Sequence, residues 1–180
     1  MISLKKTETV TSELKNLYIE YMICLSRFDS ALARMSLEKI RKEAKQEIES
    51  ALNYYGQIYL VFSDNNLVGM VVVGTYPNAF CRSDIYIQEF YIRKAFRRKG
   101  IGREVFGMIL HSPEIAGDRK DVSMFILQKN DPANKFWGHI MDEFGFEDRT
   151  EAGCFYAGDS RCTWHYYSKK GEDEEVSKDA

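Results

Sequence analysis

A strand, a basic turn and a helix follow one another directly in YIRKAFRRKGIGREVF, residues 91–106. The first residues continue the apolar run IYIQEFYI, residues 85–92, and the residues after Gly100 have the apolar spacing of a helix. Basic side chains gather at this turn: Arg97, Arg98, Lys99 and Arg103. Because glycine allows close backbone approach and a helix N-terminus favours negative charge, the turn is predicted to bind an anion.

The overall charge restricts what that anion can be. The chain has 180 residues, a net charge of -2 and a pI near 6.0, so its basic patch is local. We therefore expect a small phosphate ligand and no nucleic-acid partner, since a duplex needs an extended basic surface. We also expect no membrane partner, because the longest apolar run, LVGMVVVG at 67–74, is too short to span a bilayer.

The N-terminal sequence and the cysteines favour a cytoplasmic protein without metal. MISLKKTETV lacks the apolar core of a signal peptide. The cysteines form no CxxC pair, so zinc spacing is absent and reduced thiols are expected: Cys24, Cys81, Cys154 and Cys162.

The chain alternates helical and strand patterns, which predicts an α/β or α+β fold around a central sheet. Ser36 is expected to cap a helix that ends at a left-handed Gly56, and Asp131 to cap a later helix that ends at Gly145. Two strands are expected to close the sheet after Gly145. We predict one domain over residues 1–168 and a disordered acidic tail over residues 169–180.

Two well-known phosphate loops do not match the glycine turn. A dinucleotide fingerprint needs glycine at Val105, and a Walker A loop needs lysine at Met108. The remaining arrangement, in which backbone N–H groups converge at a helix N-terminus, suits a pyrophosphate.

Several motifs together carry a family resemblance. RRKGIG, residues 97–102, resembles the Q/R-x-x-G-x-G/A signature of the GCN5-related N-acetyltransferases, the GNAT superfamily. NDPANKFW, residues 130–137, is similar to the family's N-x-x-A-x-x-F-Y motif, and a Gly145-Phe146 pair follows it. The resemblance covers residues 57–167. It implies a mixed, mostly antiparallel sheet that splays between its fourth and fifth strands, with acetyl-coenzyme A as co-substrate, and family members are often homodimers.

The resemblance also implies a set of coenzyme-binding residues. The turn would bind the pyrophosphate, the backbones of Phe90 and Ile92 would pair with the pantetheine arm, and the amide of Asn130 would meet the pantetheine amides. Asn130 could instead be an ordinary turn residue. The full predicted set is Phe90, Ile92, Arg97, Arg98, Lys99, Gly100, Ile101, Gly102, Arg103, Asn130 and Phe136.

Catalysis is predicted to involve Glu89 and the backbone of Ile92. Glu89 would remove the proton of the acceptor amine, on the opposite strand face from Phe90 and Ile92, and the Ile92 N–H would stabilise the oxyanion. The alternative for Glu89 is a solvated or arginine-paired side chain. Trp137 replaces the family's tyrosine acid and is expected to pack in the core, so water, Tyr91 or a C-terminal tyrosine would reprotonate the thiolate.

The leading hypothesis is therefore an N-acetyltransferase acting on a primary amine of a small molecule or a peptide. Acids and aromatic residues in three loops suit a cationic acceptor: Phe28, Asp29, Tyr76, Asp84, Tyr156 and Asp159. Two alternatives stay open, a non-catalytic acyl-coenzyme A sensor and a nucleic-acid module that uses RKAFRRK.

Overall fold

The computed structural model describes residues 1–74, 84–150, 155–157 and 160–170. Within them, eight strands form one sheet in the order β1-β2-β3-β4-β5-β8-β6, and β7 pairs with β8. The strands are β1 Ile2–Thr7, β2 Gly56–Ser63, β3 Asn66–Gly74, β4 Asp84–Ile92, β5 Asp121–Leu127, β6 Phe146–Asp148, β7 Phe155–Ala157 and β8 Ser160–Lys169.

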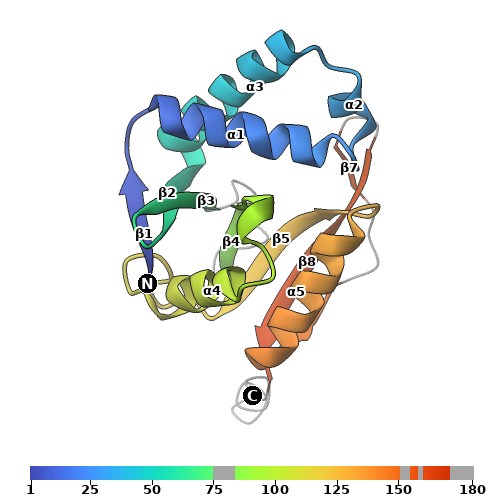
Figure 1. Cartoon of the computed structure of the whole chain (residues 1–180). Helices are drawn as coiled ribbons and strands as arrows, with labels where there is room; N and C mark the ends of the chain where they lie inside the picture. Colours follow the sequence, from blue (N-terminus) through green and yellow to red (C-terminus); the bar gives the residue numbers. More distant parts are fainter. Residues whose placement is uncertain (75–83, 151–154, 158–159, 171–180) are drawn as a thin grey trace.

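Helices cover both faces of this sheet (Figure 1). They are α1 Ser12–Leu25, α2 Ser30–Ala33, α3 Leu37–Ser50, α4 Ile101–His111 and α5 Asp131–Glu143, with a π-helical turn η1 Ala51–Tyr55 and a 3-10 turn η2 Lys94–Phe96. Side-chain caps start α1 and α3, where Thr11 accepts from Leu14 N–H and Ser36 accepts from Lys39 N–H. The predicted cap at Ser36 is confirmed.

Two apolar cores lie on opposite faces of the sheet. On one face α1 and α3 bury a cluster that includes Ile58, Met70, Val72 and Tyr91. On the other face α4 and α5 bury a larger cluster that includes Val71, Ile85, Ile92, Phe106 and Trp137. Residues of β3 alternate between the two clusters, as expected for a strand buried on both faces. The core packing predicted for Trp137 is confirmed, since its side chain is 6% exposed.

The sheet is mixed and mostly antiparallel, as predicted. Only β4 and β5 run parallel, and they pair over just three residues each, Asp84–Tyr86 with Asp121–Ser123. Beyond Tyr86 the two strands separate, so the predicted splay is also present (Figure 1).

Two local predictions are wrong. Gly56 does not end a helix in the left-handed conformation, because α3 widens into η1 and the chain then enters β2 at an extended Gly56 (φ -146°). Three strands rather than two follow Gly145, since the short β6 pairs with β8 separately from β7. Gly145 itself is left-handed (φ 74°) after α5, as predicted.

The ends of the predicted domain are only partly visible. Lys169 still belongs to β8, and Lys170 N–H donates to Gly145 O, whereas residues 171–180 of the expected tail lie outside the described residues. Among the described residues, every helix is too short or too polar to cross a bilayer.

Candidate active site

The splay leaves one edge of β4 without a neighbouring strand. Arg93 N–H donates to Val68 O at 2.8 Å, which marks Arg93 and Val68 as a hydrogen-bonded pair of the β3–β4 ladder. Since hydrogen-bonded and non-hydrogen-bonded pairs alternate along an antiparallel ladder, the N–H and C=O groups of Phe90 and Ile92 point away from β3. They face the space between β4 and β5.

A cavity of about 510 Å³ opens at this position. Its walls come from β4 and β5, the last turns of α1, the first turns of α5, and Cys162 of β8. Among the described residues that line it, Asp29 and Glu89 are carboxylates and none is a lysine, arginine or histidine. The cavity therefore has an acidic character beside an apolar wall that includes Met124, Ile126 and Trp137.

A β-bulge orients Glu89 within β4. Val72 pairs with Glu89 and Val73 pairs with Ile87, so Gln88 is an extra residue without a partner in β3. The bulge explains how Ile87 can lie in the α4–α5 core while Glu89 points to the face covered by α1. The prediction that Glu89 lies on the opposite face from Phe90 and Ile92 is confirmed.

Two tyrosines of α1 bind the Glu89 carboxylate. Tyr18 Oη donates to Oε1 at 3.3 Å, and Tyr21 Oη donates to Oε2. The pKa of Glu89 is raised from 4.5 to about 7, and burial is the largest cause. The charge of Glu47 also raises this pKa, whereas the hydrogen bonds from Tyr21 and Tyr18 lower it. A carboxyl group that titrates near neutrality can both accept and release a proton at physiological pH. Sequence reasoning missed the two tyrosines, whose spacing resembles an ordinary apolar helix face.

The basic turn has the backbone geometry of an anion cradle. Arg98 (φ 61°) and Gly100 (φ 79°) are both left-handed, and α4 begins at Ile101 without a side-chain cap. The first intrahelical bond in this turn is from Glu104 N–H to Gly100 O. The preceding N–H groups of the helix therefore remain available to a ligand, in contrast to the capped starts of α1 and α3.

The basic side chains of the turn do not all face the same way. Arg97 Nε donates to Ile92 O at 2.7 Å and so fastens the turn to the end of β4. Arg103 forms an ion pair with Glu143 of α5. The exposed Arg98 forms no side-chain hydrogen bond and no ion pair among the described residues. Lys99 Nζ lies 5.3 Å from the ring centre of Phe96.

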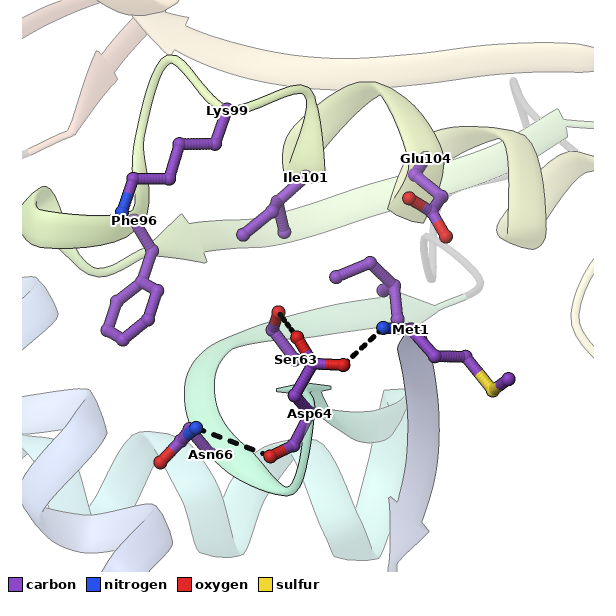
Figure 2. A pocket seen from close by; sticks show the side chains of 9 residues that line it. Met1, Ser63, Asp64, Asn66, Phe96, Lys99, Ile101 and Glu104 are labelled. Carbon is purple, nitrogen blue, oxygen red and sulfur yellow. Dashed lines mark hydrogen bonds and ion pairs between the residues drawn. The ribbon is translucent and has the colours of Figure 1, made fainter.

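Lys99 borders a second, smaller pocket of about 370 Å³ (Figure 2). In this view Phe96, Lys99 and Glu104 lie on one side, and Asp64 with the N-terminal residue lies on the other. Asp64 is paired with the N-terminal ammonium of Met1, and Glu104 offsets the charge of Lys99, so the pocket is a poor match for a diphosphate. The candidate active site is the cavity at the splay.

Phe136 lies where the turn meets α5. A Cβ on Gly102 would come within 3.0 Å of the Phe136 ring, so only glycine fits there without displacing that ring. Phe136 also contacts Phe90 and Trp137, with ring centres 5.7 Å and 5.0 Å apart. The start of α4, the open edge of β4 and the first turns of α5 therefore meet at one aromatic contact.

Asn130 caps α5, and the predicted cap at Asp131 is wrong by one residue. Asn130 Oδ1 accepts from Ala133 N–H at 3.3 Å, while Asp131 is already helical and Pro132 follows it. Both residue types are good caps, so the sequence favoured neither. The Asn130 Nδ2 group lacks an acceptor in the described part of the chain, and the residue lines the cavity.

The structure brings together only part of the predicted acceptor site. Asp29 is 8% exposed, lines the cavity and caps α2 through Oδ1, which accepts from Ala31 and Leu32 N–H. Tyr91 instead lies in the α1–α3 core, on the other face from Phe90 and Ile92, which makes it a poor candidate acid. Tyr76, Asp159 and the side chains of Asp84 and Tyr156 lie outside the described residues.

No cluster of three or more potential metal ligands occurs in the described ranges. Of the described cysteines, Cys24 is partly buried and Cys162 is buried.

Comparison with known proteins defines the class. The acetyltransferase (GNAT) family model matches residues 14–142, so the chain belongs to this family. The alpha-tubulin N-acetyltransferase of Plasmodium vivax (strain Salvador I) is 29% identical over 79 residues, which are 40% of this chain and 43% of that protein. The chain thus matches less than half the length of this relative.

Solved structures share the fold. One is the acetyl transferase from Salmonella typhimurium that modifies the N-terminal serine of 50S ribosomal subunit protein L7/L12, with a TM-score of 0.63 and 18% identity over 93% of this chain and 94% of that chain. Another is the PaiA N-acetyltransferase from Thermoplasma acidophilum in complex with coenzyme A, with a TM-score of 0.57 and 16% identity over 94% of this chain and 98% of that chain.

Proposed function

We propose that this protein is an acetyl-coenzyme A-dependent N-acetyltransferase whose acceptor is a primary amine of a small molecule or a peptide. The observation that carries the proposal is the open edge of β4. There the backbone groups of Phe90 and Ile92 point away from β3, and Phe90 and Glu89 both line the cavity. An acetyl donor bound along that edge would therefore lie next to an amine bound in the cavity.

The residues of this edge fit an acyl-coenzyme A. Phe90 offers an N–H and a C=O to an extended amide-containing chain, in the manner of an added strand. The amide nitrogen of Asn130 is a donor on the opposite wall. The uncapped N–H groups at the start of α4 suit the diphosphate, assisted by the helix dipole and the nearby arginines.

The chemistry can be derived from the chain's own groups. Bound acetyl-coenzyme A would supply an acetyl thioester, a carbonyl activated toward an amine. Glu89 would accept a proton from the acceptor ammonium, which leaves the nitrogen with its electron pair. The Ile92 N–H would donate to the carbonyl oxygen as negative charge develops on it. As the C–S bond breaks and the amide forms, the nitrogen loses its second proton, and water in the cavity would carry that proton to the departing thiolate, because Trp137 cannot donate usefully to it.

The acceptor is proposed to be cationic. Asp29 and the ionised form of Glu89 give the cavity negative charge, and the described residues that line it include no basic side chain. An ammonium group is therefore attracted into the site before it loses its proton. The names of the relatives, which include enzymes acting on alpha-tubulin and on ribosomal protein L7/L12, support a peptide amine as the acceptor class.

Coenzyme release tests this proposal. The protein is mixed with acetyl-coenzyme A and a panel of diamines, lysine peptides and N-terminal peptides, and free thiol is measured. Release with at least one acceptor is expected. Coenzyme binding without turnover on any amine would replace the enzyme by the alternative, a non-catalytic acyl-coenzyme A sensor.

A matched pair of glycine variants tests the binding edge separately. Gly102→Ala places a methyl group within 3.0 Å of Phe136, whereas Gly138→Ala on α5 meets no atom within 4 Å. Calorimetry should show weaker coenzyme A binding for the first variant and unchanged binding for the second. Absence of coenzyme A affinity in the wild type would refute the proposed function.

A further inference from the structure

Both oxygens of the Glu89 carboxylate are engaged by α1. Tyr18 donates to one and Tyr21 to the other, across 71 and 68 residues of sequence. The two phenols are three residues apart, so they lie one above the other on one helix face. Their ring centres are 5.7 Å apart in an edge-on arrangement. The carboxylate is therefore held from two directions.

The helix that carries these phenols is itself fastened to β4. Arg93 Nε and Nη2 each donate to the Glu20 carboxylate at 2.8 Å, and Nη1 donates to Leu67 O at 2.7 Å. Cys24 Sγ lies 3.6 Å from Tyr91 Oη. These contacts on either side of Tyr21 fix α1 relative to the strand, so the phenols are presented to Glu89 in a defined geometry.

We propose that Tyr21 is a positioning residue for the reaction, whose phenol holds the Glu89 carboxylate in the orientation that receives the acceptor's proton. The inference rests on the proposed function, in which Glu89 is that base. Tyr21 lines the cavity together with Glu89, whereas Tyr18 is 1% exposed and does not line it. Tyr21 therefore contacts the proposed base and also lines the cavity in which the acceptor would bind.

The surroundings of Glu89 set the sign of the effect. Tyr18 and Tyr21 face it from α1 and Glu47 from α3. Tyr86 and Tyr91 share its strand, and Asp29 also lines the cavity. The hydrogen bond from Tyr21 favours the charged carboxylate, so removing that hydroxyl raises the pKa of Glu89. Burial and the charge of Glu89 raise the pKa of Tyr21 itself well above its usual range, so its phenol keeps its proton and remains a donor.

The proton balance follows from this assignment. One N–H bond of the acceptor ammonium breaks, a new O–H bond forms on Glu89, and the electron pair stays on nitrogen. Tyr21 neither gains nor loses a proton. Without the Tyr21 hydroxyl, the ionised form of Glu89 is populated only at higher pH. The pH at which the rate begins to rise should therefore be higher.

The test is the pH dependence of kcat/KM in Tyr21→Phe with an acceptor found in the coenzyme-release panel. The acid limb should move to higher pH by about one unit, since a hydrogen bond to a charged group is worth roughly a tenfold change in ionisation. Tyr18→Phe should move it less, because at 3.3 Å the bond from Tyr18 is longer than a typical O–H···O bond. Tyr59→Phe is the matched control, since its hydroxyl binds Gln57 and its side chain lies in the core on the other sheet face.

A second measurement needs neither coenzyme nor substrate. Carbon-13 NMR of the Glu89 carboxyl in the free protein should show a higher pKa in Tyr21→Phe than in the wild type or in Tyr59→Phe. In the wild type, the Tyr21 ring carbon bonded to oxygen should shift with the same midpoint as Glu89. That signal keeps the inference testable even if the variant does not fold.

The outcomes separate the inference from the function on which it rests. If Glu89→Gln removes the acid limb but Tyr21→Phe leaves it in place, Glu89 remains the base and the role of Tyr21 is refuted. If Glu89→Gln retains the limb, the base assignment falls and the inference falls with it. Absence of the shared NMR midpoint also refutes the inference.

Discussion

Replacing Glu89 with glutamine should change how stability depends on pH. Burial is the main cause that raises the pKa of this carboxyl from 4.5 to about 7 in the folded protein. The native state therefore keeps a proton that the unfolded chain releases at lower pH. As the pH rises from the unfolded pKa through the folded one, this group progressively favours unfolding. Glutamine cannot ionise, so Glu89→Gln should lose this dependence.

The expected magnitude follows from the two pKa values. One pKa unit corresponds to about 1.4 kcal/mol, so the full effect is about 3 kcal/mol, an upper bound because the cavity admits water. Urea unfolding of both proteins at about pH 5 and about pH 8 should show the variant gaining up to that amount relative to wild type. The exposed Glu38→Gln serves as control and should show no such gain. Parallel stability curves for wild type and Glu89→Gln would refute the assignment of a raised pKa.

Three further predictions concern residues around the cavity. Asn130→Ala should lower the free energy of unfolding by about 1 kcal/mol because the helix cap is lost, while Asn130→Ser should retain stability. Both variants should bind coenzyme A more weakly in calorimetry. Unchanged binding by the serine variant would limit Asn130 to capping. Asp29→Asn keeps a good helix cap but removes the charge, so urea unfolding should be unchanged while KM for a cationic acceptor rises about tenfold; an unchanged KM would contradict the cationic-site argument. Arg93→Met should lower the free energy of unfolding by urea by about 1 kcal/mol, because it removes the bidentate pair with Glu20; the loss is modest because that pair is partly exposed. An unchanged free energy would show that the pair does not stabilise α1 on the sheet.

Features of short sequence range were readable from the sequence. One such feature is DNN, residues 64–66, whose composition is typical of a hairpin turn between two apolar runs. Asp64 and Asn65 are both left-handed in the structure (φ 49° and 68°), which suits the tight turn between the twisted strands β2 and β3. The glycine turn before α4 was likewise found, since residues 97–102 supply both its flexibility and its charge. Gly56 was misread because a glycine after a helix resembles a left-handed cap even where the chain continues into a strand.

Features that depend on distant partners were not readable. The bulge at Gln88 exists only in the pairing of β3 with β4, and no local pattern in IYIQEFYI signals it. Tyr18 and Tyr21 have the spacing of an apolar helix face, and Tyr18 is indeed almost fully buried. Their second role, as donors to Glu89, requires the packing of α1 across β4 and therefore a structure.

The proposed donor and acceptor sites come from different parts of the chain. The turn, the edge of β4 and Asn130 are close to the family's sequence motifs. The acceptor wall also uses α2 and β8, where Ser30 N–H donates to Ser160 Oγ at 3.2 Å across 130 residues of sequence. This bond lies next to Asp29 and two residues before Cys162, which both line the cavity. If the proposed sites hold, substitutions along this α2–β8 contact should change the accepted amine without disturbing the proposed coenzyme edge, because the two sets of residues come from different elements.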